Sequence, residues 1–129
     1  MKQVNAKTIE WILRVAVAGE FLGHGIFALQ VKQGWIPYFT SIGISVETAT
    51  ILLPIIGGLD IILAILVLIK PIRIALIWIT FWAFLTALIR PITGEPIWDF
   101  VERFANIGAP LALLYLIGLP KNLKELFTS

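Results

Sequence analysis

Residues 46–69 read VETATILLPIIGGLDIILAILVLI, and after Glu47 the only charged residue in this stretch is Asp60. A helix needs roughly 20 apolar residues to cross the ~30 Å hydrocarbon core of a bilayer. The stretch has that length, and it is followed by Lys70-Pro71, a pair typical of a helix end. We therefore predict a transmembrane helix over residues 46–69.

Three further apolar stretches of similar length lie outside this one, at residues 8–29, 72–89 and 99–119. The whole chain of 129 residues is 59% hydrophobic and only 14% charged, whereas soluble domains carry roughly 25% charged residues. Only helices and closed barrels satisfy their backbone hydrogen bonds inside lipid, and these stretches lack the alternation of barrel strands. We predict an all-α integral membrane protein with a single domain over residues 1–129, built as an antiparallel four-transmembrane-helix bundle.

Basic residues beside the predicted helices favour one orientation, because cytoplasmic flanks are enriched in Lys and Arg. One side has only Lys32 and Arg90. The other side has Lys2, Lys7, Lys70, Arg73, Lys121 and Lys124. This bias places both termini in the cytoplasm of a multi-pass protein of the inner (cytoplasmic) membrane. The aromatic run 34–39 then lies at the outer interface, where we expect it to act as an anchor. The first apolar stretch is too long and too polar for a cleaved signal peptide, so we expect it to be retained.

Ionisable residues inside a membrane helix are costly unless paired, so each is a candidate functional residue. At ~100° per residue, the polar residues of the first helix share one face, as do those of the fourth. Depths counted at ~1.5 Å per residue predict one polar column in the centre and outer half of the bundle. The candidates for binding a ligand or a proton are Glu20, His24, Asp60, Arg90, Glu102, Arg103 and Asn106.

The charges of this column do not balance when His24 is neutral. We expect Arg14 and Asp60 to form a structural ion pair, and Arg103 to bridge the first and fourth helices. One interior carboxylate still lacks a cation, and Glu20 or Asp60 is then the residue that holds a proton or a ligand.

Structural interpretations compete with these functional ones. Asp99 and Glu102 have the spacing of a capping box at a helix start. His24 could be a hydrogen-bonded interior histidine. Gly57, Asp60 and Ala64 share a face whose small residues predict that another helix approaches closely.

Composition and motifs exclude several chemistries. The absence of cysteine removes disulfides, thiolate nucleophiles and iron–sulfur clusters. Walker, Rossmann, zinc and nucleophile-elbow motifs are absent. We expect no metal site, and no haem because a second axial ligand is not evident. A net charge of +2 is too small to indicate a nucleic-acid partner.

Several short motifs resemble those of one family. They are Arg14 with Gly19, Phe21 and His24-Gly25, then residues 54–60 (PIIGGLD), 86–91 (TALIRP), 102–106 (ERFAN) and 110–114 (PLALL). Together they resemble an uncharacterised branch of the DoxX-like family of small four-helix bacterial membrane proteins. Some relatives are subunits of a thiosulfate:quinone oxidoreductase, and others associate with redox enzymes. The resemblance therefore implies the four-helix fold and an association with redox chemistry.

Three functions remain open from the sequence. The first is a redox-associated subunit whose interior polar site binds a small ligand or a quinone head group; any catalysis would be that of a membrane quinone-linked oxidoreductase. The second is a small proton- or ion-coupled transporter that uses Glu20. The third is a structural or assembly protein. Expected partners are the lipid bilayer and either a larger redox enzyme or further copies of the chain.

Overall fold

The computed structural model describes residues 3–129, and within that range the regular structure is entirely helical. Four helical stretches are long and apolar enough to cross a membrane: Ala6–Leu29, Val46–Ile69, Arg73–Ile92 and Trp98–Ile117. The elements in chain order are α1 (Ala6–Leu29), η1 (Gln33–Trp35), α2 (Ile36–Thr40), α3 (Val46–Ile69), α4 (Arg73–Ile92), α5 (Trp98–Val101), α6 (Phe104–Ile117) and η2 (Glu125–Phe127). The predictions of an all-helical fold and of four helices long and apolar enough to cross a membrane are confirmed.

Local sequence explains where the long helices begin. The Asn5 side chain accepts a hydrogen bond from the Thr8 backbone N–H at 3.2 Å, so α1 starts two residues earlier than predicted. Ser45 caps α3 in the same way through the backbone N–H of Thr48, also at 3.2 Å. Such side-chain caps satisfy N–H groups that have no partner within the helix.

The ends of the last two long helices differ from their predicted positions. α4 continues past residue 89 to Ile92, because the backbone N–H of Thr93 caps carbonyls of its last turn. The fourth stretch is interrupted at Glu102 and Arg103, which separate α5 from α6. The guanidinium of Arg103 donates to the Asp99 carbonyl at 2.8 Å. The backbone N–H of Arg103 donates instead to the Phe100 carbonyl, which tightens the chain at this point.

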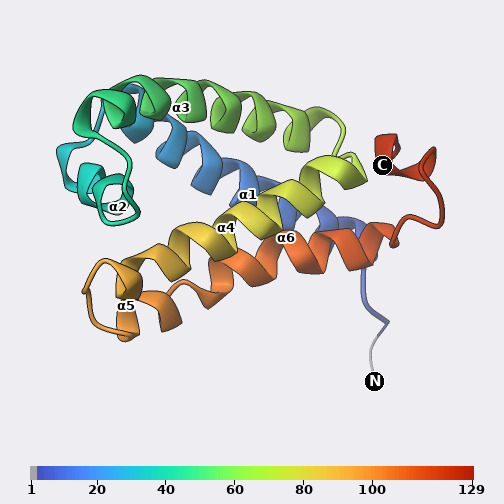
Figure 1. Ribbon diagram of the computed structural model, residues 1–129. Helices are drawn as coiled ribbons and strands as arrows, with labels where there is room; N and C mark the ends of the chain where they lie inside the picture. Colours follow the sequence, from blue (N-terminus) through green and yellow to red (C-terminus); the bar gives the residue numbers. More distant parts are fainter. Residues whose placement is uncertain (1–2) are drawn as a thin grey trace.

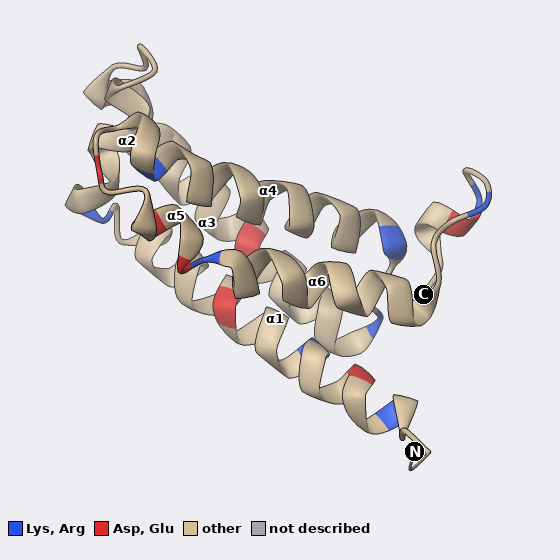
Figure 2. Ribbon diagram, turned by 90° about the horizontal axis from the view of Figure 1, so that it is seen from below, with Lys and Arg blue, Asp and Glu red and all other residues tan. Residues whose placement is uncertain are grey.

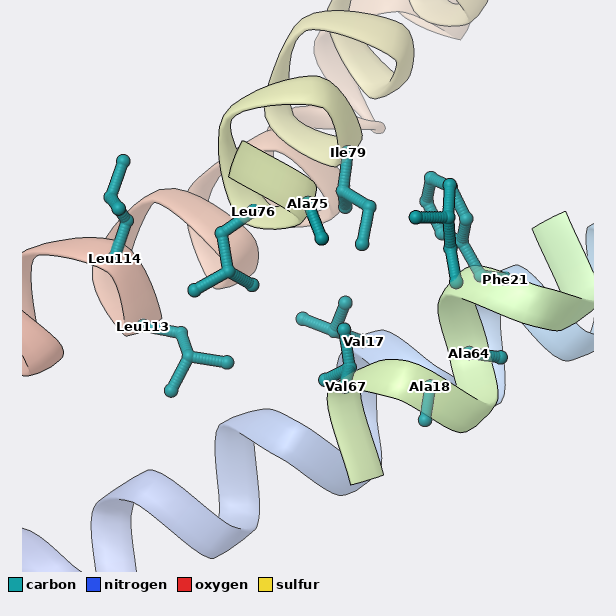
Figure 3. Packing of buried hydrophobic residues seen from close by; sticks show 11 residues of the cluster. Val17, Ala18, Phe21, Ala64, Val67, Ala75, Leu76, Ile79, Leu113 and Leu114 are labelled. Carbon is teal, nitrogen blue, oxygen red and sulfur yellow. The ribbon is translucent and has the colours of Figure 1, made fainter. Parts of the chain in front are cut away.

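The long helices lie side by side, with the two ends of the chain near the same end of the molecule (Figure 1). α1 packs most extensively against α3, and α4 against α6; α1 also contacts α6, whereas α3 and α4 touch less. The main core lies toward the end that carries the termini, and Figure 3 shows its residues converging from α1, α3, α4 and α6. A smaller apolar cluster at the other end consists of Ala28, Ile36, Ala49 and Leu53.

α1 and α3 are in backbone contact where two glycines meet. A Cβ atom on Gly57 would lie 2.6 Å from the Gly25 carbonyl oxygen, and one on Gly25 would lie 2.8 Å from the Gly57 carbonyl oxygen. The prediction that small residues on the Gly57 face permit a close helix approach is confirmed. This contact fixes the positions of His24 and Asp60, which lie within one turn of Gly25 and Gly57 respectively.

Most of the apolar surface of these helices is not covered by the protein itself. α3 has a mean hydropathy of 2.8 in its most apolar window, yet only 33% of that window is buried. Soluble monomers rarely expose continuous apolar surfaces of this kind. The outward faces of the helices are therefore suited to lipid.

Candidate functional site: an interior cavity between α1, α2, α3 and α4

A cavity of about 270 Å³ lies where α3 and α4 diverge, toward the end of the molecule that holds α2. α1, α2, α3 and α4 all contribute to its wall. Its lining is mostly apolar and aromatic: Ala28, Trp35, Phe39, Ile42, Leu53, Ile56, Trp82, Leu85, Leu88, Ile89 and Ile92. The polar residues of the wall are His24, Tyr38, Asp60, Thr86 and Arg90. A cavity of this composition suits a small molecule with an apolar body and a polar end.

Asp60 is the one acid among the residues that line the cavity, and it is deeply buried. Its residue exposure is 3%, and its Oδ1 atom has no hydrogen-bond partner. An unpaired polar atom at this depth carries a desolvation penalty that a ligand could remove. Figure 2 shows that most charged residues lie near the ends of the long helices. Acidic residues also lie midway along α1 and α3.

The predicted ion pair between Arg14 and Asp60 is wrong. Arg14 forms its ion pair with Glu10, one turn earlier in α1, at 3.1 Å. Its guanidinium also donates to the carbonyl oxygens of Val67, at 2.9 Å, and of Leu68. Arg14 is therefore structural, as expected, but it joins α1 to the end of α3 and leaves Asp60 without a cation.

η1 and the residue before it close one end of the cavity through aromatic contacts. The rings of His24 and Trp35 meet edge to face, with centroids 5.7 Å apart. The Lys32 ammonium lies over the Phe27 and Trp35 rings, at 4.6 and 5.2 Å from their centroids. The aromatic run predicted as an interfacial anchor thus also forms part of the cavity wall.

A polar cluster ties α2 to the end of α4. Arg90 donates to the Tyr38 hydroxyl at 2.8 Å, and that hydroxyl donates to Glu95 at 2.9 Å. Arg90 and Glu95 are also paired at 3.8 Å. Burial raises the pKa of Tyr38 most, and the hydrogen bond to Glu95 raises it further. The hydroxyl therefore stays protonated and can donate to Glu95. Sequence reasoning missed Tyr38 and Glu95 as site residues. The sequence offered one signal, for Glu95: an acidic residue in a turn flanked by prolines, on the same side of the membrane as the aromatic run 34–39 was predicted to lie.

The remaining predicted site residues lie outside the cavity wall. Glu20 is half-buried on α1, and the charges of Asp60 and Arg103 act on it. Glu102 is 64% exposed in its side chain and pairs with Arg103 at 2.6 Å. Asn106 is half-buried on α6. The cavity therefore brings together His24, Asp60 and Arg90 from the predicted set, but not Glu20, Glu102, Arg103 or Asn106.

The expected bridge from Arg103 to Glu20 is also absent from the hydrogen bonds and ion pairs of residues 3–129. The side chain of Arg103 instead bonds locally, to the Asp99 carbonyl and to Glu102. α6 nevertheless packs against α1, the helix that carries Glu20 and His24. The fourth helical stretch therefore borders the polar region without supplying a wall of the cavity.

Among the described residues, no group of three or more His, Cys, Asp and Glu side chains could hold a metal ion. The site thus offers hydrogen bonding, aromatic contact and one unpaired acid. Comparison with protein-family models, with curated proteins and with solved structures found no match to this chain.

Proposed function

We propose that the protein is an antiparallel four-helix bundle across the inner (cytoplasmic) membrane, with both termini in the cytoplasm. The bias of Lys and Arg toward the flanks shared with the termini supports this orientation. Contacts within the chain are consistent with it. Arg73, at the start of α4, donates to Thr128 near the C-terminus and to the Ile117 carbonyl at the end of α6.

Single cysteines test the orientation cleanly, because the chain has none of its own. Lys70→Cys, in the turn between α3 and α4, should react only from the cytoplasmic side of sealed membranes. Pro96→Cys, in the turn before α5, should react only from the outside. Labelling of both positions from the same side with a membrane-impermeant maleimide would overturn the proposed topology.

We propose that the cavity binds a small, mostly apolar molecule, with a quinone head group as the leading candidate. The observation that carries this proposal is an apolar, aromatic cavity whose polar residues come from four helices. Its volume of about 270 Å³ is at the lower end for ligand sites, which suits one ring with its substituents. An attached isoprenoid tail would extend between the helices into lipid.

This binding site fits the DoxX-like resemblance, and we propose that the chain is a redox-associated membrane subunit of that kind. A larger redox enzyme or further copies of the chain would then be its partners. If the protein takes part in catalysis, it does so as a subunit of a quinone-linked oxidoreductase.

Cavity filling provides the test. Thr86 lines the cavity and its hydroxyl bonds only within its own helix, to the Ala83 carbonyl at 3.1 Å. Thr86→Phe should therefore fill the cavity and lower the affinity for a short-chain ubiquinone at least tenfold, measured by quenching of the wild-type tryptophans in nanodiscs. Ala112→Phe, on an exposed face of α6, is the matched control and should bind as the wild type does. Equal quenching in all three proteins would show that the quinone dissolves in lipid and does not enter the cavity.

A proton- or ion-coupled transporter that uses Glu20 is the second candidate. The observation that favours it is half-buried Glu20 within α1, which takes part in none of the ion pairs of residues 3–129. Proton release from purified protein on substrate addition, lost in Glu20→Gln, would favour transport over a redox-associated role. Stoichiometric co-purification with a larger enzyme, together with a cavity that binds nothing, would favour the third function, assembly.

A further inference from the structure

Glu20 in α1 and Asp60 in α3 are buried or half-buried carboxylates that take part in none of the ion pairs of residues 3–129. Within residues 3–129 the ion pairs are Arg14 with Glu10, Arg90 with Glu95, and Arg103 with Glu102. None of these three pairs includes Glu20 or Asp60. Asp60 is 3% exposed, and its Oδ1 atom accepts no hydrogen bond.

The cavity wall has one acid without a cation of its own. Of its two charged residues, Arg90 has its own acid in Glu95, whereas Asp60 has none. An isolated carboxylate in a low-dielectric interior either takes up a proton or pairs with a cation.

The rest of the wall has the chemistry that stabilises an organic cation. Trp35, Tyr38, Phe39 and Trp82 all line the cavity, and the faces of aromatic rings attract cations, including quaternary ammonium groups. An inorganic ion would need several oxygen ligands, but the cavity wall supplies a single carboxyl group and is otherwise mainly apolar. An apolar body with one positive charge matches both the lining and Asp60.

We propose that the cavity accepts small lipophilic organic cations, with the Asp60 carboxylate as the counterion and the aromatic side chains around the apolar body. This proposal rests on the cavity being a ligand site, and it adds a ligand class to the neutral quinone head group. In the complex the positive charge of the ligand would neutralise the Asp60 carboxylate inside the low-dielectric interior.

Two probes of nearly the same shape separate charge from apolar fit. Benzyltrimethylammonium has a quaternary nitrogen where neopentylbenzene has a carbon atom. We expect the purified full-length protein in detergent to bind the cation at least tenfold more tightly than the neutral probe, measured by equilibrium dialysis. Asp60→Asn should lower the affinity for the cation at least tenfold and leave that for neopentylbenzene unchanged. Glu102→Gln removes the same charge at an exposed position and should change neither affinity.

The outcomes distinguish this proposal from the proposed site itself. Equal affinity for both probes, or a cation affinity that Asp60→Asn does not change, would overturn the pairing of the cation with Asp60. If Thr86→Phe still abolishes quinone binding in that case, the cavity remains a site for neutral ligands. If Thr86→Phe affects neither the two probes nor the quinone, the cavity is not a ligand site and both proposals fail. A thermal melt of Asp60→Asn that matches the wild type ensures that a loss of binding is not a loss of folding.

Discussion

Gly57→Ala is expected to destabilise the folded protein by about 1–3 kcal/mol, the range typical of overpacking in a close-packed interior. The added Cβ would lie 2.6 Å from the Gly25 carbonyl oxygen and 2.8 Å from the Leu29 backbone nitrogen. Both atoms belong to the backbone of α1, so no side-chain rotation can relieve the contact. The helices must move apart, and Gly57→Leu should leave little folded protein.

The neighbouring glycine provides the control. Gly58→Ala places its Cβ where nothing lies within 4 Å, and alanine favours a helix over glycine by about 1 kcal/mol in water. We expect Gly58→Ala to match or exceed the wild type in stability, measured by unfolding in mixed detergent micelles. Similar losses in Gly57→Ala and Gly58→Ala would mean that helix propensity, and not the contact between α1 and α3, governs this region.

The same contact links stability to the candidate site. Gly25 directly follows His24, and Gly57 lies one turn before Asp60, so separating α1 from α3 also separates two polar residues of the cavity wall. Binding of a quinone or of an organic cation should weaken in Gly57→Ala even where the protein stays folded. A backbone contact between two glycines thus sets the geometry of side chains that a ligand would touch.

The sequence was sufficient to predict the helices because each carries its own signals. Apolar length identified the four stretches, and the Lys70-Pro71 pair marked the end of α3 where the structure has it. The small face around Gly57 predicted a close helix contact, which the structure confirms. These signals are local, and they depend on spacing along a single helix.

The partners of the polar residues could not be predicted in the same way. The estimate of depth in the membrane assumed straight helices whose ends lie at the same level. It therefore predicted that Arg14 pairs with Asp60 and that Arg103 pairs with Glu20. The interruption at Glu102 and Arg103 changes the course of the fourth stretch, and no pattern in the sequence predicted that α2 would cover the cavity. Tyr38 and Glu95 are 57 residues apart, and each is unremarkable in its own segment.

Arg14→Leu is expected to lower the free energy of unfolding by about 3–5 kcal/mol, because it removes charged hydrogen bonds to buried carbonyl groups. In a continuous helix the Val67 carbonyl would accept from the N–H of residue 71, but Pro71 has none. The N–H of Ile72, which would have served Leu68, donates to the Lys70 carbonyl at 2.8 Å. The break that ends α3 thus leaves two carbonyl oxygens, and Arg14 of α1 donates to both.

Arg103→Leu is the matched control, since it removes the same charge from the fourth helical stretch. Arg103 donates to one backbone carbonyl, that of Asp99, whereas Arg14 donates to two. The ion pair of Arg103 is with a Glu102 side chain that is 64% exposed, and exposed pairs contribute about 0–1 kcal/mol. Glu10→Gln, which keeps Arg14 and both of its carbonyl contacts, should also cost less than Arg14→Leu. Unfolding of the three variants in the same micelles gives the order directly. If Arg103→Leu proves as costly as Arg14→Leu, then Arg103 bridges α1 and the fourth stretch after all. Arg14→Leu should be the most destabilising of the three, because two carbonyl groups would lose their donor. In the membrane interior no water is present to donate to them instead.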